Sequence, residues 1–159
     1  MTRERFIELA TAEQEPLRRF LLALCGGDRM EAEDIAQEAF VKAWLASERF
    51  DERYKFRTWI FKIAYRTLLD HAKRPRIERM PDHTELSVHS DYSADLAFRY
   101  EALYRAIDQL PERARAATLL YHIEGYSIKD IATITHSNPV AVRQQLHRGL
   151  TRLRQILKP

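Results

Sequence analysis

The sequence is poor in cysteine and glycine, with one Cys and four Gly among 159 residues. A single cysteine excludes a disulfide framework within the chain and any zinc site built from several cysteines, so a reducing, cytoplasmic setting is expected. The sequence also lacks a glycine-rich phosphate loop and histidines at metal-ligand spacing. We therefore predict that the protein is not an enzyme, and that it has no catalytic residue, metal, cofactor or small-molecule substrate.

Long apolar stretches are missing as well. No uninterrupted apolar run approaches the roughly 20 residues that span a bilayer, and the opening segment MTRERFIELATAEQE lacks the apolar core of a signal peptide. The length excludes a large enzyme scaffold such as an α/β barrel, and it suits one ordinary domain or two small ones. These absences again predict a cytoplasmic protein.

The net charge of +3 conceals an uneven distribution along the chain. Residues 1–75 carry 14 basic and 13 acidic side chains, residues 76–95 carry 2 and 5, and residues 96–159 carry 10 and 5. A basic C-terminal part that follows an acidic connector favours nucleic-acid binding. The alternative is a basic helix face that is simply solvated.

The composition predicts an all-α protein, because Ala, Leu, Arg and Glu are abundant and no hairpin signal is present. We expect an interruption of the first helix at Pro16, since proline breaks a helix interior. Residues 76–94 have no sustained period and are expected to be a flexible linker between two small helical domains, at 1–75 and 95–159. Helices in the first domain are expected at about 3–25, 30–47 and 56–74.

The second domain contains a helix-turn-helix pattern. A capping box that starts at Ser127 predicts a short helix, and the sequence Ser137-Asn138-Pro139 predicts the start of a longer, basic helix. An apolar stripe predicts the buried side of this last helix. The stripe consists of Val142, Leu146, Leu150, Leu153 and Leu157.

The opposite side of the last helix has residue types that read DNA. Arginine can bond guanine bidentately, asparagine or glutamine can bond adenine, and further arginines can neutralise phosphates. The alternative is a helical hairpin with a solvated basic face. The candidate DNA-reading residues are Asn138, Ala141, Arg143, Gln144, Gln145, His147 and Arg148.

A second candidate segment interleaves aromatic and basic side chains between residues 50 and 66. Unpaired bases stack on aromatic rings for about 1–3 kcal/mol each, while cations hold the backbone. The segment therefore suits single-stranded nucleic acid, although the aromatic residues could instead form an ordinary buried stripe. The candidate residues are Arg53, Lys55, Phe56, Arg57, Trp59, Lys62, Tyr65 and Arg66.

In this order, the segments resemble the two-domain RNA polymerase sigma factors of the extracytoplasmic-function (ECF) group. The stretch EAEDIAQEAFVKAW (31–44) is similar to the polymerase-binding segment of that family. FRTWIFKIAYRTLLDHAKR (56–74) is similar to its promoter-melting and −10-recognition segment. LPERARAATLLYHIEGYSIKDIATIT (110–135) and VAVRQQLHRGLTRLR (140–154) are similar to its −35-binding domain.

The resemblance implies an alternative sigma factor that binds core RNA polymerase and directs promoter recognition, DNA melting and initiation at a restricted set of promoters. Residues 1–75 would form sigma region 2, and residues 95–159 would form sigma region 4, a winged-helix-like helix-turn-helix domain. The implied partners are the clamp and flap of the polymerase, promoter DNA and an anti-sigma factor. The implied polymerase contacts are Asp34, Gln37, Glu38, Val41 and Leu45.

The chain departs from the family pattern at two places. Tyr65 follows Ile63-Ala64 where the family continues with Arg and Asn, and the last helix begins with Ala141-Val142-Arg143-Gln144-Gln145, where Thr-Val-(Lys/Arg)-Ser-Arg is common. The second departure removes phosphate anchors. Two other functions remain open: a helix-turn-helix regulator with an N-terminal domain for dimerisation or signal reception, and a helical protein that sequesters a partner without binding DNA.

Overall fold

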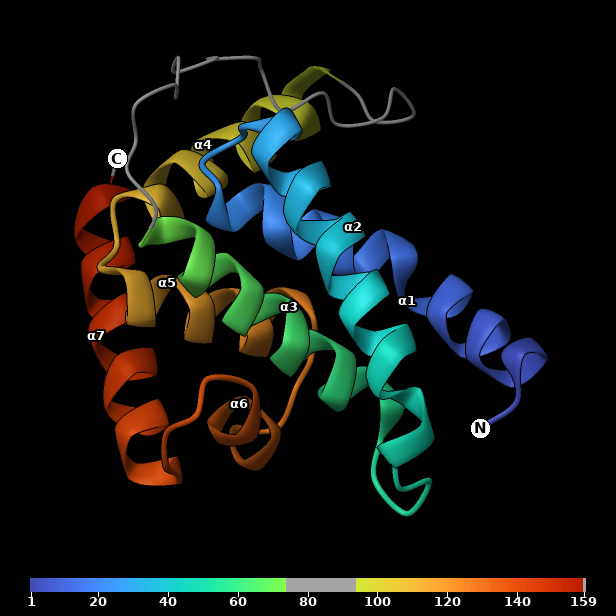
Figure 1. Ribbon diagram of the computed structural model, residues 1–159. Helices are drawn as coiled ribbons and strands as arrows, with labels where there is room; N and C mark the ends of the chain where they lie inside the picture. Colours follow the sequence, from blue (N-terminus) through green and yellow to red (C-terminus); the bar gives the residue numbers. More distant parts are fainter. Residues whose placement is uncertain (74–93, 159) are drawn as a thin grey trace.

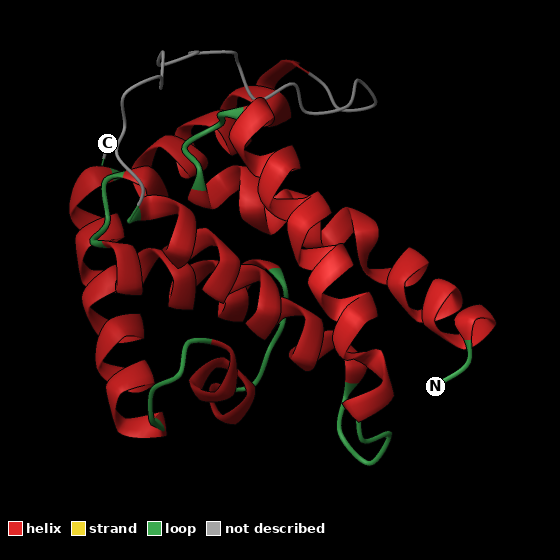
Figure 2. Ribbon diagram, in the orientation of Figure 1, coloured by secondary structure: helices red, strands yellow, loops and turns green. Residues whose placement is uncertain are grey.

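The computed structural model describes residues 1–73 and 94–158, and these residues form helices and turns without any β-strand (Figures 1 and 2). The C-terminal part was expected to resemble a winged-helix domain, and among the described residues it shares only the helices of such a domain. Almost all of the predicted linker at 76–94 lies outside the described residues. The helices are α1 (Arg3–Leu24), α2 (Arg29–Ala46), the 3₁₀ helix η1 (Ser47–Arg49), α3 (Phe56–Ala72), α4 (Ala94–Asp108), α5 (Glu112–Thr118), the π-helix η2 (Leu119–Ile123), α6 (Ile128–Ile134) and α7 (Pro139–Ile156). None of the described helices combines the length and apolar character needed to cross a membrane.

Helix α1 continues through Pro16, so the expected interruption is wrong. Proline removes one backbone hydrogen bond and costs about 3 kcal/mol in a helix interior. On both sides of it, however, apolar side chains are buried: Phe6 and Ala10 before the proline, Leu17 and Phe20 after it. Packing against α2 and α3 thus holds the two halves of α1 in one helix.

The N-terminal helix group, α1–α3, is built around aromatic rings. The rings of Phe20 and Phe61 lie 5.4 Å apart between their centroids, and those of Phe6 and Phe56 lie 5.9 Å apart in an edge-on arrangement. Helix α2 turns a row of alanines and the fully buried Ile35 towards this core. The small side chains of α2 leave room for the rings of α1 and α3.

The C-terminal helix group, α4–α7, is packed through small residues. Gly149 of α7 is buried, and a Cβ atom placed there would lie 2.5 Å from the Thr118 Oγ1 atom of α5. The glycine therefore allows α5 and α7 to approach more closely than alanine would. This close approach explains a glycine in the middle of a helix, where it costs roughly 1 kcal/mol relative to alanine.

The buried side of α7 differs from the predicted stripe at two positions. Leu150 and Leu157 are 38% and 45% exposed. A stripe that steps by 4, 4, 3 and 4 drifts away from the helical period of 3.6 residues. The observed inner positions alternate steps of 4 and 3, and they are Val142, Leu146, Gly149, Leu153 and Ile156.

The turn between α6 and α7 contains a residue in the left-handed region. His136 has a φ of 53°, and the Ser137 N–H donates to the carbonyl of Ala132 at 2.8 Å. This bond defines a Schellman end of α6, with His136 where glycine is usual. Asn138 then caps α7, because its side-chain oxygen accepts from the Ala141 N–H at 2.9 Å.

The two helix groups lie against each other: α6 packs on α3, and α4 packs on α1 (Figure 1). Helix α7 is at one edge of the molecule, while α1 and α2 are at the other (Figure 1). The described residues thus form a closed arrangement with a seam between α1–α3 and α4–α7.

Candidate polymerase and DNA interfaces

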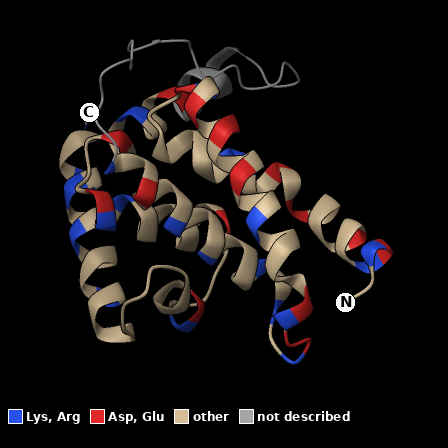
Figure 3. Ribbon diagram, in the orientation of Figure 1, with Lys and Arg blue, Asp and Glu red and all other residues tan. Residues whose placement is uncertain are grey.

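The outward face of α2 carries four of the five predicted polymerase contacts in exposed positions. Asp34 and Gln37 are exposed, and Val41 and Leu45 are 58% and 75% exposed. Met30, at the start of the same helix, is 78% exposed. Apolar side chains grouped on a surface mark a site for protein partners. Figure 3 places acidic residues on α1 and α2 and basic residues along α7.

Glu38 differs from the other four predicted contacts. It is partly buried, its carboxylate is hydrogen-bonded to His71 of α3, and its Oε1 lies 3.1 Å from Lys42 Nζ. The hydrogen bond with His71, aided by Lys42, lowers the pKa of Glu38 from its usual value. Glu38 therefore connects α2 to α3, and its carboxylate is already engaged within the N-terminal helix group.

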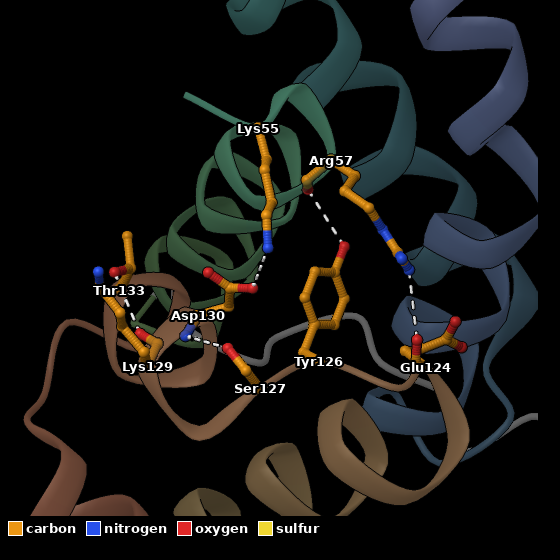
Figure 4. Close-up of polar contacts among 8 residues, drawn as sticks. All are labelled: Lys55, Arg57, Glu124, Tyr126, Ser127, Lys129, Asp130 and Thr133. Atoms are coloured by element: carbon orange, nitrogen blue, oxygen red, sulfur yellow. Dashed lines mark hydrogen bonds and ion pairs between the residues drawn. The ribbon is translucent and has the colours of Figure 1, made fainter. Parts of the chain in front are cut away.

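In the predicted single-strand segment, Arg53, Lys55 and Arg66 are exposed, whereas Arg57 and Lys62 are partly buried. Lys55 and Arg57 contact the C-terminal helix group (Figure 4). Lys55 Nζ lies 3.1 Å from Asp130 Oδ2. Arg57 Nη2 donates to the backbone carbonyl of Glu124 at 3.2 Å, and the guanidinium carbon lies 4.4 Å from the centre of the Tyr126 ring.

The other three predicted cations of this segment make no contact across the seam in the interactions described. Arg66 is exposed and Lys62 is partly exposed. Arg53 bonds the neighbouring carboxylate of Asp51 at 2.6 Å within the loop before α3.

The aromatic residues of this segment do not form the exposed stacking surface that we expected. Phe56 and Tyr65 are only 8% and 4% exposed, and burial raises the pKa of the Tyr65 hydroxyl. Trp59 is partly buried, with its ring 4.8 Å from that of Phe50. The helical period turns these rings into the core of the N-terminal helix group. Tyr54, which the candidate set missed, presents a ring that is 70% exposed.

The predicted −35 residues fall into two sets on α7. Arg143, Gln144, His147 and Arg148 are exposed, and neighbours three and four apart lie on one face of a helix. Ala141 and Gln145 are partly buried, and the Asn138 side-chain oxygen is engaged in capping α7. The four exposed side chains have the donors and acceptors that suit a major groove.

A cluster that the sequence did not predict joins the two helix groups. The Glu124 side chain is 2% exposed, and its carboxylate accepts two hydrogen bonds from Arg19 of α1, at 2.9 and 2.8 Å. The Tyr126 hydroxyl donates to the carbonyl of Arg57 at 3.2 Å (Figure 4), and its ring lies 5.1 Å from that of Phe61. Burial raises the pKa of Tyr126, so the hydroxyl keeps the proton that it donates.

No local signal in the sequence could have revealed this cluster. The segment around Glu124 indicates only the end of a helix, since Gly125 follows it with a φ of 77°. Its partner in α1 is 105 residues away. Among the described residues, no group of three or more His, Cys, Asp or Glu could hold a metal ion.

Comparisons with known proteins match sequence in both helix groups. Residues 9–76 match the family model of Sigma-70 region 2, and residues 100–153 match that of Sigma-70, region 4. The RNA polymerase sigma-H factor of Pseudomonas aeruginosa is 34% identical over 146 residues, which are 83% of this chain and 76% of that protein. The ECF RNA polymerase sigma factor SigW of Bacillus subtilis is 31% identical, over 83% of this chain and 78% of that protein.

The chain belongs to the ECF group of RNA polymerase sigma factors. As an alternative sigma factor it directs transcription initiation at specific promoters, and members of this family bind core RNA polymerase and promoter DNA. Sigma factors are initiation factors rather than enzymes. The match to region 2 favours this function over a regulator whose N-terminal domain serves dimerisation, because that match covers α2 and α3.

Two solved structures share the fold of this sigma factor. The sigma factor RpoE of Bartonella quintana, in complex with the anti-sigma factor NepR, matches with a TM-score of 0.79 and 21% identity over 98% of both chains. CnrH, in complex with the cytosolic domain of CnrY, matches with a TM-score of 0.74 and 22% identity over 98% of this chain and 89% of CnrH. Both likenesses extend over both helix groups.

Proposed function

We propose that this sigma factor docks on the clamp of core RNA polymerase through α2, and that the segment around α3 and the exposed face of α7 hold promoter DNA. Residues 1–75 act as region 2, and residues 95–159 act as region 4, which also meets the polymerase flap. The protein works in the cytoplasm and has no catalytic chemistry of its own. DNA opening is driven by the binding of unpaired bases.

The observation that carries this assignment is the contrast between the exposed faces of α2 and α7. Val41 and Leu45 are exposed on the same face of α2 as the acidic Asp34, a combination that suits a protein partner and repels DNA phosphates. Arg143 and Arg148 are exposed on α7, where they can reach bases or phosphates. In this proposal, polymerase therefore binds α2 and duplex DNA binds α7.

The cations of α3 provide the single-strand contacts in this proposal. Lys62 and Arg66 lie at the surface of α3, and Lys55 and Arg57 lie at its N-terminal end. Exposed Tyr54 offers a ring in the adjoining loop, which can stack on an unpaired base. Trp59, which is partly buried, packs against the rings of Phe50 and Phe56 at this end of α3.

We also propose an anti-sigma factor as a partner. The support is the likeness, over 98% of this chain, to two sigma factors that were each solved with an anti-sigma protein. Co-purification of the tagged chain from its own cells, followed by identification of stoichiometric partners, tests this proposal. Recovery of polymerase subunits alone would argue against a dedicated inhibitor.

Run-off transcription with purified core polymerase tests the function as a whole. Core polymerase with this chain should initiate at a subset of promoters in a genomic library, whereas core polymerase alone should not. The absence of both stimulation and core binding would refute the proposal.

The polymerase face is tested by Leu45→Glu, which places a charge on the exposed apolar surface of α2. Affinity for core polymerase should fall at least tenfold, because the core of a protein interface is depleted of charges. Ile7→Glu is the matched control: Ile7 is 51% exposed but lies on α1. An equal loss of polymerase affinity in both variants would show that the exposed face of α2 is not the specific docking site.

The DNA face is tested by Arg143→Ala and Arg148→Ala. Each should weaken binding of duplex −35 DNA, by about 1–3 kcal/mol for an arginine that contacts a base. Core binding should be unchanged, since α2 is untouched. Gel-shift titrations of the reconstituted holoenzyme measure the first effect, and pull-down with core polymerase measures the second. Equal loss of both activities would mean that the faces are assigned wrongly.

A further inference from the structure

We infer that Gln144 and Val140 form the base-reading pair of α7, and that they select two neighbouring A·T base pairs. Gln144 binds the adenine of one pair, and Val140 covers the thymine methyl group of the other. This inference rests on the proposed function, which brings the exposed face of α7 to duplex −35 DNA. It goes further by naming the bases that this face recognises and the two side chains that choose them.

The middle of the exposed face of α7 is not occupied by arginine. Because successive residues of an α-helix are turned by about 100°, Val140, Gln144 and His147 lie within about 60° of one another. All three are exposed, whereas Val142 and Gly149, on the opposite side of α7, are buried. Helices α4, α5 and α6 pack on α7. The middle row of the outward face therefore consists of valine, glutamine and histidine.

Two exposed arginines lie on either side of this middle row. Arg143 and Arg148 are turned away from each other by about 140° around the helix axis. A recognition helix in the major groove points residues near its N-terminus at base edges, with a phosphate backbone on each side of it. The two arginines are therefore placed closer to the two backbones, and the middle row is placed closer to the bases.

Only one of the three amide side chains near the start of α7 is placed to read adenine. An amide reads adenine when its oxygen accepts from the N6 amino group and its nitrogen donates to N7. The Asn138 oxygen already accepts from the Ala141 N–H at 2.9 Å. Gln145 is partly buried, whereas Gln144 is exposed in the middle row. Gln144 is therefore the residue that can make both hydrogen bonds.

Val140 adds an apolar contact one turn before Gln144. Its side chain is 60% exposed. The Cβ atoms of residues four apart on a helix are about 5–6 Å apart, and successive base pairs are stacked about 3.4 Å apart. The two side chains can thus meet neighbouring base pairs. The apolar group in the major groove is the thymine C5 methyl, and covering it removes apolar surface from water.

Base analogues in the duplex test each contact separately. Promoters found by run-off transcription supply the −35 duplexes, and gel-shift titration of the reconstituted holoenzyme measures affinity. 7-Deazaadenine lacks the N7 acceptor, and at one adenine it should weaken binding by about threefold to tenfold, as expected for one hydrogen bond. Uracil lacks the thymine methyl, and at a neighbouring pair it should weaken binding by about threefold to fourfold. A −35 element insensitive to 7-deazaadenine at every adenine would overturn the inference.

Variants of α7 connect each analogue effect to one side chain. Gln144→Ala should bind the adenine and 7-deazaadenine duplexes equally, and Val140→Ala should bind the thymine and uracil duplexes equally. Gln155→Ala is the matched control, because Gln155 is an exposed amide on the same helix about three turns further on, and it should keep both sensitivities. Sensitivity to 7-deazaadenine that persists in Gln144→Ala, or that is lost in Gln145→Ala, would overturn the inference. Circular dichroism confirms that the variants are folded.

A change of specificity gives a readout that a structural role of Gln144 would not produce. Arginine bonds the O6 and N7 atoms of guanine bidentately, so Gln144→Arg should exchange the preferred A·T pair for G·C at the same position. The ratio of the two affinities should change at least tenfold in favour of G·C. Uniform weakening on all duplexes, without a change in the preferred base, would overturn the inference.

Pull-down with core polymerase separates this test from the proposed function. All the variants should bind core polymerase like the wild type, since α2 is untouched. If the holoenzyme forms and initiates but Gln144→Ala retains the base preference, this inference fails and the proposed function stands. If no holoenzyme forms, the proposed function fails, and the analogue experiment uses duplexes that the full chain selects from a random library. Failure to select any duplex would overturn this inference as well.

Discussion

The cores of the two helix groups are filled in different ways. In α1–α3 the space between helices is occupied by rings, such as the fully buried Phe20 and Phe61, against alanines of α2. In α4–α7 the helices approach closely through Gly149 and the alanines of α5. The first core should therefore be sensitive to the removal of atoms and the second to their addition, because a closely packed interior tolerates neither voids nor overlap.

The largest expected effect is that of Phe20→Ala. Removing the ring leaves a cavity beside Phe61 and should lower the free energy of unfolding by about 3–5 kcal/mol. Urea unfolding followed by circular dichroism measures this change. Phe20→Leu, which retains most of the apolar volume, is the control and should lose much less. Similar losses in the two variants would show that the site collapses around the missing ring.

Gly149→Ala tests the opposite sensitivity in α4–α7. The added methyl group would overlap Thr118 Oγ1, so the variant should lose about 1–3 kcal/mol in spite of the better helix propensity of alanine. Thr118→Ala should restore most of this loss in the double variant, because the Thr118 hydroxyl is buried without a hydrogen-bond partner. A Gly149→Ala variant more stable than the wild type would contradict the close approach.

The two helix groups also differ in the residue that adopts a positive φ after a helix, at the ends of α1 and α6. Gly26 has a φ of 62° after α1, whereas His136 has a φ of 53° after α6. His136→Gly should raise the free energy of unfolding by about 0.5–1 kcal/mol, since glycine adopts this conformation without steric cost. Gly26→Ala should lower it, because the new Cβ would also lie 3.3 Å from Asp108 Oδ1. Thermal unfolding of both variants tests whether the free energy of unfolding rises for His136→Gly and falls for Gly26→Ala.

The smallest effect concerns Glu38 in the N-terminal helix group. Its pKa is lowered by His71 and Lys42, so its contribution to stability is present above the usual carboxyl pKa of 4.5 and is lost as the pH falls through the lowered value. Glu38→Gln should cost about 0.5 kcal/mol near neutral pH and almost nothing at pH 3. Unfolding measured at both values tests this, and a pH-independent difference would show that packing is the cause.

The local helix signals were predictable from neighbouring residues. Ser127 caps α6 by accepting from the Asp130 N–H at 3.1 Å, as its capping box predicts, and Asn138 with Pro139 begins α7. These features involve contacts of three residues' separation, which sequence alone specifies. The same reasoning failed at Pro16, where distant packing partners outweighed a strong local signal.

The candidate sites were predictable only in part. The exposed positions of Leu45 and Arg143 follow from helical periodicity, so their surfaces could be found from the sequence. Phe56 and Tyr65 could not be assigned to surface or core, because an aromatic ring between cations fits either place. Their burial depends on the rings and alanines supplied by α1 and α2.

The sequence by itself determined the helices, their order and the membership of the sigma-factor family, since these depend on periodicity, caps and local motifs. Only the tertiary structure decided which charged side chains form ion pairs between the two helix groups. The bidentate contact of Arg19 with Glu124 joins residues 105 positions apart, and Lys55 meets Asp130 across the same seam. No local pattern encodes such pairs, because burial and partner position arise only when the helix groups pack together.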